Sequence, residues 1–297
     1  MHHKDLTEVE KTLRDVDFPT SVIIDSINSC NYNCKICARR LMTRKHDRMD
    51  IATVKKVIDE IALEQANTNF WLVFYGEPLL IKERIYYISD YAYKKGLKNI
   101  YLNTNGSLLN DDAVEIIADS SINRVIVSID AYSEKTYGLM RKAGNRDLVY
   151  KNVRNLISRI NDVGANIQVV AQIIKSPQTE SEIESFTEYW KKTGALVKIK
   201  DKINWTELGN EINSSSRIAC PWLFTTLPIL NNGDAVICGC DYNGKHVIGN
   251  VNENTIKQLW NNEHYVIRRN HIEHKWNAIP DICKTCSDWN ILGSEML

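Results

Sequence analysis

Short runs of β-branched and other apolar residues alternate along the chain with longer stretches in which apolar positions recur every three or four residues. The short runs are typical of strands buried on both faces, and the longer pattern is typical of helices that pack one side onto a sheet. The predicted strands cover 21–27, 70–75, 99–104, 124–130, 167–174 and 196–200. Helices are predicted after the first five strands, at 50–65, 81–96, 110–120, 150–162 and 179–194.

This alternation predicts an α/β fold with a parallel sheet, either doubly wound or wrapped as part of a (β/α) barrel. In both arrangements ligands bind at the carboxyl ends of the strands. Polar segments stand at four of those ends: "NSCNYNCKIC" (28–37), "YGEP" (75–78), "NTNG" (103–106) and "SID" (128–130). The sequence therefore predicts one shared site at this edge of the sheet.

Charge and hydropathy exclude some classes of protein. The 297 residues include 37 basic and 37 acidic side chains, so nothing favours a nucleic-acid partner. No apolar run approaches the roughly 18 residues of a membrane span, and the N-terminus lacks an apolar signal core. We expect a cytoplasmic protein without a membrane partner, in which the eight cysteines do not form disulfides.

The cysteines fall into two groups, which favours metal or cluster ligation over scattered packing. Cys30, Cys34 and Cys37 form the first group, with the spacing C-x3-C-x2-C. A structural zinc site needs four protein ligands, and no histidine stands nearby at ligand spacing. A 4Fe–4S cluster held by three thiolates instead keeps one iron open for a substrate or cofactor.

With these motifs the chain resembles the radical S-adenosylmethionine (SAM) enzymes. "CNYNCKIC" resembles the family's cluster motif, "YGEPLL" its Gly-Gly-Glu-Pro segment with Tyr75 in place of the first glycine, and "LNTNG" and "VIVSIDA" its next two strand ends. Ile36 stands where the family usually has an aromatic residue. The resemblance implies a partial (β/α)6 TIM-like barrel over residues 21–204, after an N-terminal segment, 1–20.

The resemblance also implies roles for individual residues. The three cysteines would hold a cluster whose open iron chelates SAM, and one electron would cleave SAM to a 5′-deoxyadenosyl radical that abstracts a hydrogen atom. The electron would come from a reductant such as flavodoxin or ferredoxin. The implied cofactor-binding residues are Tyr75, Gly76, Glu77 and Pro78 around the methionyl ammonium, Asn105, Ser128 at the ribose, and Arg141 at the SAM carboxylate. From the residues alone, Glu77 could be a turn residue, Ser128 and Asp130 could cap a helix, and Arg141 could be a surface charge.

In the region from 205 to 297 the regular alternation of strands and helices ends. "FTTLPIL" and "DAVIC" flank "NNG" and predict a hairpin, and 255–272 reads as one helix before a final C-x2-C. Cys220, Cys238, Cys283 and Cys286 make a four-ligand set that on spacing alone suits zinc or an iron–sulfur cluster. The region resembles the auxiliary-cluster modules called SPASM or, when shortened, twitch, which implies a small α+β module with one auxiliary 4Fe–4S cluster.

Cys240 is left over, and it carries the hypothesis about the reaction. If the hairpin strand continues, Cys238 and Cys240 share a face, and Cys240 could donate a hydrogen atom to a substrate radical, as in an epimerase. It could equally be an alternate ligand or a packed thiol.

The likeness to aminoglycoside-pathway enzymes favours a small carbohydrate-like substrate, with plausible pocket residues at Asp130, Trp205, Trp222, Asp241 and Tyr242. The alternatives are an alcohol dehydrogenase, a peptide maturase, although 1–20 is short for a leader-recognition domain, and a non-enzymatic zinc-binding protein.

Overall fold

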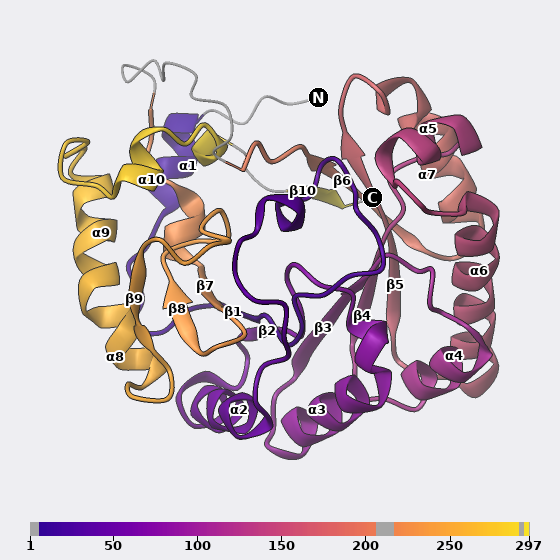
Figure 1. Ribbon diagram of the computed structural model, residues 1–297, viewed down its shortest axis with the longest axis horizontal. Helices are drawn as coiled ribbons and strands as arrows, with labels where there is room; N and C mark the ends of the chain where they lie inside the picture. Colours follow the sequence, from indigo (N-terminus) through magenta and orange to yellow (C-terminus); the bar gives the residue numbers. More distant parts are fainter. Residues whose placement is uncertain (1–5, 206–216, 291–293, 297) are drawn as a thin grey trace.

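The computed structural model describes residues 6–205, 217–290 and 294–296, and its centre is a curved parallel sheet. The first six strands are neighbours in chain order and parallel. They are β1 (Ser21–Ile24), β2 (Asn69–Trp71), β3 (Asn99–Thr104), β4 (Arg124–Ser128), β5 (Gln168–Lys175) and β6 (Leu196–Asp201). The connecting helices α2 (Ile51–Gln65), α3 (Lys82–Lys94), α4 (Asp111–Ala118), α6 (Arg146–Val163) and α7 (Ile183–Lys192) lie around the outside (Figure 1). The predicted partial (β/α) barrel is confirmed.

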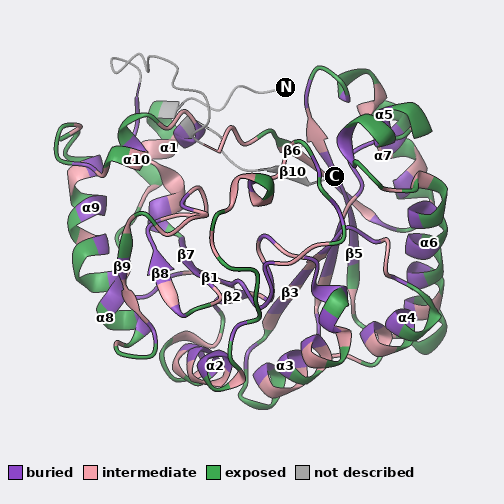
Figure 2. Cartoon of the chain, in the orientation of Figure 1, coloured by how far each residue is buried: buried purple, intermediate pink, exposed green. Residues whose placement is uncertain are grey.

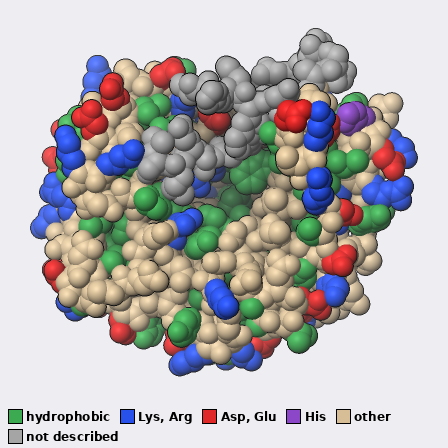
Figure 3. Space-filling view, turned by 180° about the vertical axis from the view of Figure 1, so that it is seen from behind, with side chains coloured by type: hydrophobic (Ala, Val, Ile, Leu, Met, Phe, Trp, Pro, Cys, Tyr) green, Lys and Arg blue, Asp and Glu red, His purple; other side chains and the backbone are tan. Residues whose placement is uncertain are grey.

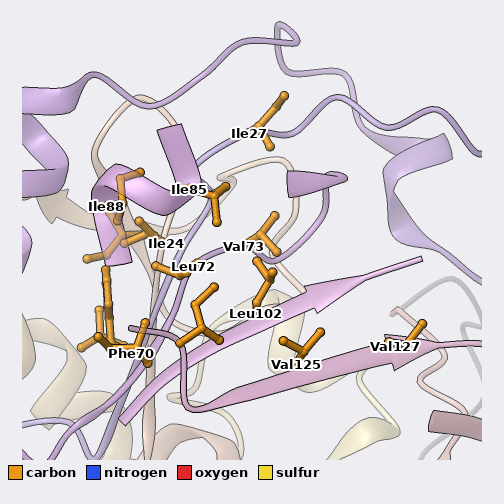
Figure 4. Packing of buried hydrophobic residues seen from close by; sticks show 14 of the residues in the cluster. Ile24, Ile27, Phe70, Leu72, Val73, Ile85, Ile88, Leu102, Val125 and Val127 are labelled. Carbon is orange, nitrogen blue, oxygen red and sulfur yellow. The ribbon is translucent and has the colours of Figure 1, made fainter. Parts of the chain in front are cut away.

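The apolar faces of strands and helices meet in one core. Figure 2 shows buried positions along the strands and exposed positions on the outer sides of the helices. In Figure 4, Ile85 and Ile88 of α3 lie close to Ile24 and Leu72, and all four belong to the main buried cluster. Each such side chain contributes about 1.5–3 kcal/mol when removed from water. This packing fixes the strand ends that carry the site.

Three strands end before the last residue predicted for them: β4 ends at Ser128 instead of residue 130, and β1 and β2 are shortened further. β2 ends at Trp71 although the run continues to Tyr75, and β1 ends at Ile24 instead of residue 27. The reason is tertiary packing: Phe74 and Tyr75 leave the sheet and pack with Val236, Trp205 and Tyr242 in a second buried cluster. The apolar run therefore serves the contact with the C-terminal region rather than the strand.

The C-terminal region extends the same sheet. The predicted hairpin is present as β7 (Thr226–Ile229) and β8 (Asp234–Val236), followed by β9 (Val247–Asn250), and β7 pairs in parallel with β1. At the other edge β10 (Ser294–Met296) pairs antiparallel with β6. The boundary between residues 204 and 205 stays a prediction, since 206–216 lie outside the described residues.

The single helix predicted over 255–272 is wrong. The chain forms α8 (Ile256–Asn261) and α9 (Glu263–Ile272), because Asn262 has ψ −114° and cannot continue a helix.

Shorter helices are α1 (Leu6–Thr12), α5 (Glu134–Met140), α10 (Asp281–Lys284) and the 3₁₀ turns η1 (Ala38–Leu41), η2 (Pro78–Ile81), η3 (Glu180–Glu182), η5 (Pro221–Phe224) and η6 (Asp288–Asn290).

The surface agrees with the balanced composition. Seen from behind in Figure 3, basic and acidic side chains are interspersed at the periphery, and hydrophobic side chains lie in a hollow near the middle of the face. Within the described residues, none of the helices has the length and apolar character needed to cross a bilayer.

Candidate active site

The first cysteine group lies in the loop that leaves β1. The backbone N–H of Tyr32 donates to Cys30 Sγ at 3.4 Å, and the N–H of Cys37 donates to the carbonyl of Cys34 at 3.2 Å, so the loop is folded tightly around its thiols. Burial raises the pKa of the Cys30 and Cys37 thiols. The thiolate form that a metal needs is therefore stable here only with a positive partner.

Glu77 lies in the loop after β2, where Gly76 allows a close backbone approach. A Cβ at position 76 would stand 2.0 Å from the carbonyl oxygen of Ile27, so only glycine fits. The N–H of Glu77 then donates to Ser29 O at 2.9 Å, which ties this loop to the cysteine loop. Pro78 follows at the start of η2, and Tyr75 keeps a negative φ, so it replaces a glycine without backbone strain.

The Glu77 carboxylate is buried and partly satisfied by donors from the next strand end. It accepts hydrogen bonds from Thr104 Oγ1 at 2.7 Å, from the Asn105 N–H at 2.8 Å and from the Leu79 N–H at 3.1 Å. Burial raises the pKa of Glu77 against these bonds, and no described Lys, Arg or His lies within ion-pair distance. The last bond also makes Glu77 the cap of η2, so the turn interpretation and a binding role are compatible.

Arg141 is buried beside the first cysteine group and is not a surface charge. Its Nη1 lies 3.7 Å from Cys34 Sγ, and its Nη2 pairs with Asp130 Oδ2. Burial opposes the charge, but Asp130 and Cys34 raise the pKa of Arg141 above its ordinary value. Asp130 also accepts from the Ile174 N–H at 3.0 Å, and its φ of 64° places it in the left-handed region.

Two further predicted residues complete this end of the site. Ser128, the last residue of β4, accepts a hydrogen bond from Gln172 Nε2 at 3.2 Å. Asn105 Nδ2 lies 3.8 Å from Cys30 Sγ. Neither Ser128 nor Asp130 caps α5, because its N-cap is Ser133.

The second cysteine group gathers on the C-terminal region. Cys220 precedes η5, Cys238 and Cys240 follow β8, and Cys283 and Cys286 lie on and just after α10. Electrostatic coupling with Cys238 and Cys286 adds to burial in raising the pKa of the Cys220 thiol. The four predicted ligands are thus brought together, with Cys240 beside them.

The spacing of Cys238 and Cys240 suggested that the hairpin strand continues through both residues. The structure shows instead that Cys240 lies beyond the end of the strand. β8 ends at Val236, and Cys238–Gly239–Cys240 form a turn in which the N–H of Cys240 donates to Cys238 Sγ at 3.4 Å. A Cβ at Gly239 would stand 2.3 Å from the Phe74 ring, so the turn lies flat on that ring. The Cys240 thiol donates to Asp288 Oδ2 at 3.5 Å.

Asp288 is a residue that the sequence did not single out. Its carboxylate accepts from the N–H groups of Asn204 and Trp205 at 2.8 and 3.0 Å, and its own N–H donates to Cys286 Sγ at 3.3 Å. Asp288 therefore links Cys240 and Cys286 to the segment that follows β6. Its position two residues after the final C-x2-C was the available signal.

Both cysteine groups open onto one cavity of about 350 Å³. Its lining includes the first three cysteines, Tyr75, Gly76, Glu77, Asn105, Ser128 and Arg141, together with Cys220, Cys238, Cys240, Cys286, Trp205 and Trp222. Pro78, Asp130, Asp241, Tyr242 and Cys283 are not among the lining residues. Asp241 instead accepts from the N–H groups of Lys245 and His246, and the Tyr75 hydroxyl donates to Gly239 O.

The cavity wall also contains side chains that the sequence interpretation missed. Lys198 and Lys200 of β6, Gln172 of β5 and Asn103 of β3 line the cavity. The signal was present in "LVKIK", where polar residues alternate with apolar ones and so share one face of the strand.

Two family models match the chain. The model of the radical SAM superfamily matches residues 24–189, and that of the SPASM iron–sulfur cluster-binding domain matches residues 220–287. These matches confirm SAM, a 4Fe–4S cluster and an auxiliary cluster as the cofactors. They favour an enzyme over a non-enzymatic zinc-binding protein.

The chain is also similar to individual proteins. It is 21% identical to the S-adenosyl-L-methionine-dependent 2-deoxy-scyllo-inosamine dehydrogenase of Niallia circulans, over 93% of this chain and 96% of that protein. It is 26% identical to a probable GTP 3′,8-cyclase of Methanocaldococcus jannaschii, over 60% of this chain and only 57% of the cyclase. The first similarity spans both cysteine groups, whereas the second covers little more than half of either protein.

Solved structures share the fold. BtrN in complex with AdoMet and 2-DOIA superposes with a TM-score of 0.64 at 18% identity, over 92% of this chain and 94% of that chain. SuiB of Streptococcus suis bound to S-adenosylmethionine superposes with a TM-score of 0.68 at 13% identity, over 96% and 74%.

Proposed function

Because the chain belongs to the radical SAM superfamily, we propose that it removes a hydrogen atom from a carbon of a small carbohydrate-like molecule and that Cys240 then returns a hydrogen atom to that carbon. The net reaction is an epimerisation. One observation carries the proposal: the Cys240 thiol lines the same cavity as Cys30, Cys34 and Cys37.

The residues around the first cysteine group fit the cofactors. Three thiols lie in one loop without a fourth, the charge of Glu77 has no described cation in ion-pair distance, and Arg141 Nε is buried without a hydrogen-bond partner. Cys30, Cys34 and Cys37 would hold the cluster. Glu77, with the backbone at Gly76 and Pro78, would bind the methionyl ammonium, and Arg141 would bind the carboxylate. Ser128 would bind the ribose, while Tyr75 and Asn105 would complete the wall.

When bound and reduced by a flavodoxin or ferredoxin, the cofactors supply a 5′-deoxyadenosyl radical that abstracts a hydrogen atom. Cys240 would then give up its S–H hydrogen to the substrate carbon, which forms the new C–H bond and leaves a thiyl. One electron from the same class of reductant and one proton restore the thiol. Asp288, which accepts the hydrogen bond from Cys240, is placed to hold that proton.

The substrate class is supported by the cavity and by one relative. Asn103, Gln172 and Trp71 line the wall, and a mixture of amide and aromatic side chains suits a hydroxylated ring. The similar Niallia circulans protein is named for 2-deoxy-scyllo-inosamine, an aminocyclitol.

Dehydrogenation is the second candidate, because that same relative is named a dehydrogenase and is similar over nearly the whole of both chains. Here the substrate would lose a hydrogen atom, a proton and an electron, with the auxiliary cluster as electron acceptor. Cys220, Cys238, Cys283 and Cys286 would ligate that cluster, and Cys240 would have no chemical role. The likeness to SuiB shows the fold alone, so peptide modification has no separate support.

The test compares wild type with Cys240→Ala after anaerobic reconstitution, using carbohydrate-like probes of both kinds, the aminocyclitol 2-deoxy-scyllo-inosamine and the carboxylated sugar D-glucuronate, in deuterated water. We expect an epimer that carries one solvent deuterium from wild type, and 5′-deoxyadenosine without epimer from the variant at unchanged iron content. Cys220→Ala is the control for loss of a proposed ligand. An oxidised product without deuterium, formed equally by Cys240→Ala, would establish the dehydrogenase instead.

A further inference from the structure

The deep wall of the cavity carries two lysines that have no partner of opposite charge in contact. Lys198 and Lys200 are two residues apart on β6, so their side chains share the face that lines the cavity. Neither ammonium group lies within 4.0 Å of a carboxylate of the described residues. Both side chains are partly buried, and a charge partly withdrawn from water costs free energy unless something compensates it.

The surroundings of Lys198 make the imbalance larger. Its nearest electrostatic neighbours are cations, Lys200 and Arg124, and its Nζ lies 5.9 Å from the centre of the Trp71 ring. Burial and these two cations lower the pKa of Lys198 to about 8. The Trp71 ring favours this charge, but no carboxylate of the described residues lies in contact with Lys198.

The carboxylates in the vicinity of Lys200 are already engaged. Asp130 pairs with Arg141, and Asp288 accepts from two backbone N–H groups and from Cys240. Burial lowers the pKa of Lys200, although both carboxylates favour its charge from beyond contact distance. The pair therefore presents an excess of positive charge to the cavity.

The sheet register places this charge apart from the residues assigned to the cofactors. Ser128, Gln172 and Lys198 are in register on β4, β5 and β6. Neighbouring strands are about 4.8 Å apart, so Lys198 lies roughly 10 Å across the sheet from Ser128. The two lysines are therefore anchored two strands away from Ser128, which is assigned to the ribose.

We propose that Lys198 and Lys200 form an oxyanion subsite for the substrate, which therefore carries a carboxylate or phosphate group. The inference rests on the proposed function only in that a carbohydrate-like molecule occupies this cavity. Both ammonium groups donate to the oxyanion, and its charge compensates theirs. A neutral sugar would leave the two charges without a partner of opposite charge.

The test measures binding directly by calorimetry, on the reconstituted holoenzyme with SAM present. The probes are D-glucuronate, D-glucose and inorganic phosphate, and the proteins are wild type, Lys198→Gln, Lys198→Arg and Lys200→Gln. Lys202→Gln is the matched control, because Lys202 is exposed just past β6 and does not line the cavity. SAM affinity is measured in the same series, since the carboxylate of SAM is the other source of an oxyanion.

We expect glucuronate to bind wild type more tightly than glucose, and its affinity to fall about 10–100-fold in Lys198→Gln, because a hydrogen bond to a charged group is lost. Lys198→Arg should retain most of the affinity, Lys202→Gln all of it, and SAM affinity should not change. Loss of SAM affinity with unchanged glucuronate binding would assign the lysines to SAM and overturn the proposal, as would absence of glucuronate and phosphate binding to wild type. Glucuronate binding without turnover of any sugar would contradict the proposed function and leave the subsite standing.

Discussion

Each cysteine group has an arginine beside it, but the two arginines are compensated differently. Next to Cys34, Arg141 is paired with the Asp130 carboxylate. Next to Cys283, the Nη2 of Arg217 donates to the carbonyl oxygen of Cys283 at 2.7 Å, and its guanidinium lies 5.0 Å from the centre of the Trp276 ring. Among the described residues no carboxylate pairs with Arg217.

The consequence concerns the potential of each bound cluster. A positive charge near a cluster favours its reduced form, and a neighbouring carboxylate cancels that effect. Arg217 would therefore favour the reduced form of a cluster held by the second group, while the Asp288 carboxylate beside Cys240 and Cys286 would oppose it. The groups also differ in number, since the first offers three thiols and the second five thiols and the Asp288 carboxylate.

The largest expected effect is the loss of the first group. In Cys34→Ala, one of three thiol ligands is missing, and we expect no reductive cleavage of SAM. The measurement is 5′-deoxyadenosine formed with dithionite. Cys240→Ala is the comparison, because it retains the first three cysteines and should cleave SAM at the wild-type rate. Cleavage by Cys34→Ala at that rate would remove Cys34 from the ligand set.

Removal of one thiol from the second group should have a narrower effect. Cys220→Ala should lose about four irons per chain, the content of one 4Fe–4S cluster, while the first group still supports SAM cleavage. Iron analysis and 5′-deoxyadenosine formation on one preparation measure both. The comparison with Cys240→Ala decides which cysteines are ligands. Unchanged iron in Cys220→Ala together with iron loss in Cys240→Ala would make Cys240 a cluster ligand and remove Cys220 from the ligand set.

The first group could be predicted from the sequence almost completely because its residues belong to single loops. Cys30, Cys34 and Cys37 lie in the loop after β1 and Glu77 in the loop after β2, and a parallel sheet brings such loops to one edge. The second group was predicted only in part. Whether Cys240 is a ligand or faces the cavity depends on Phe74 and Asp288, which lie far away in the sequence and meet the Cys238–Cys240 turn only through tertiary packing.

The lysines between the two groups illustrate the same limit. A strand of "LVKIK" type is compatible with a solvated edge or with a polar lumen, and only the position of β6 beside β5 decides that the lysines face a cavity. Likewise, the helix break at Asn262 follows from a single backbone angle that neither periodicity nor composition indicates.

Replacing Lys198 should stabilise the protein. The pKa of Lys198 is about 8, below the value near 10.4 of an unfolded chain. At pH 7 the ammonium group is therefore charged in both states, and its charge lowers the stability of the folded state. Lys198→Gln should therefore raise the free energy of unfolding by up to about 3 kcal/mol at pH 7. The stability of wild type should rise between about pH 8 and 10.4, where only the folded state has released the proton, and the advantage of the variant should shrink.

Denaturant unfolding of ligand-free protein at pH 7 and pH 9.5 measures this difference, with Lys202→Gln as the control that should not change it. Destabilisation by Lys198→Gln at both pH values would show that Lys198 has a structural partner. It would then count against an unbalanced charge in the cavity wall.

The smallest expected effect tests the comparison of the two arginines itself. Arg217→Gln removes a positive charge beside the second group and should lower the reduction potential of its cluster by about 100 mV, as expected for one charge several ångströms away at an effective dielectric constant near 20. Redox titration followed by electron paramagnetic resonance measures both clusters in one sample. Arg269→Gln is the matched control, because Arg269 is exposed and pairs with Glu273 on the outside of α9. If the potential of the second cluster is the same in both variants, the charge of Arg217 does not distinguish the two sites, and the number of ligands alone must account for their different roles.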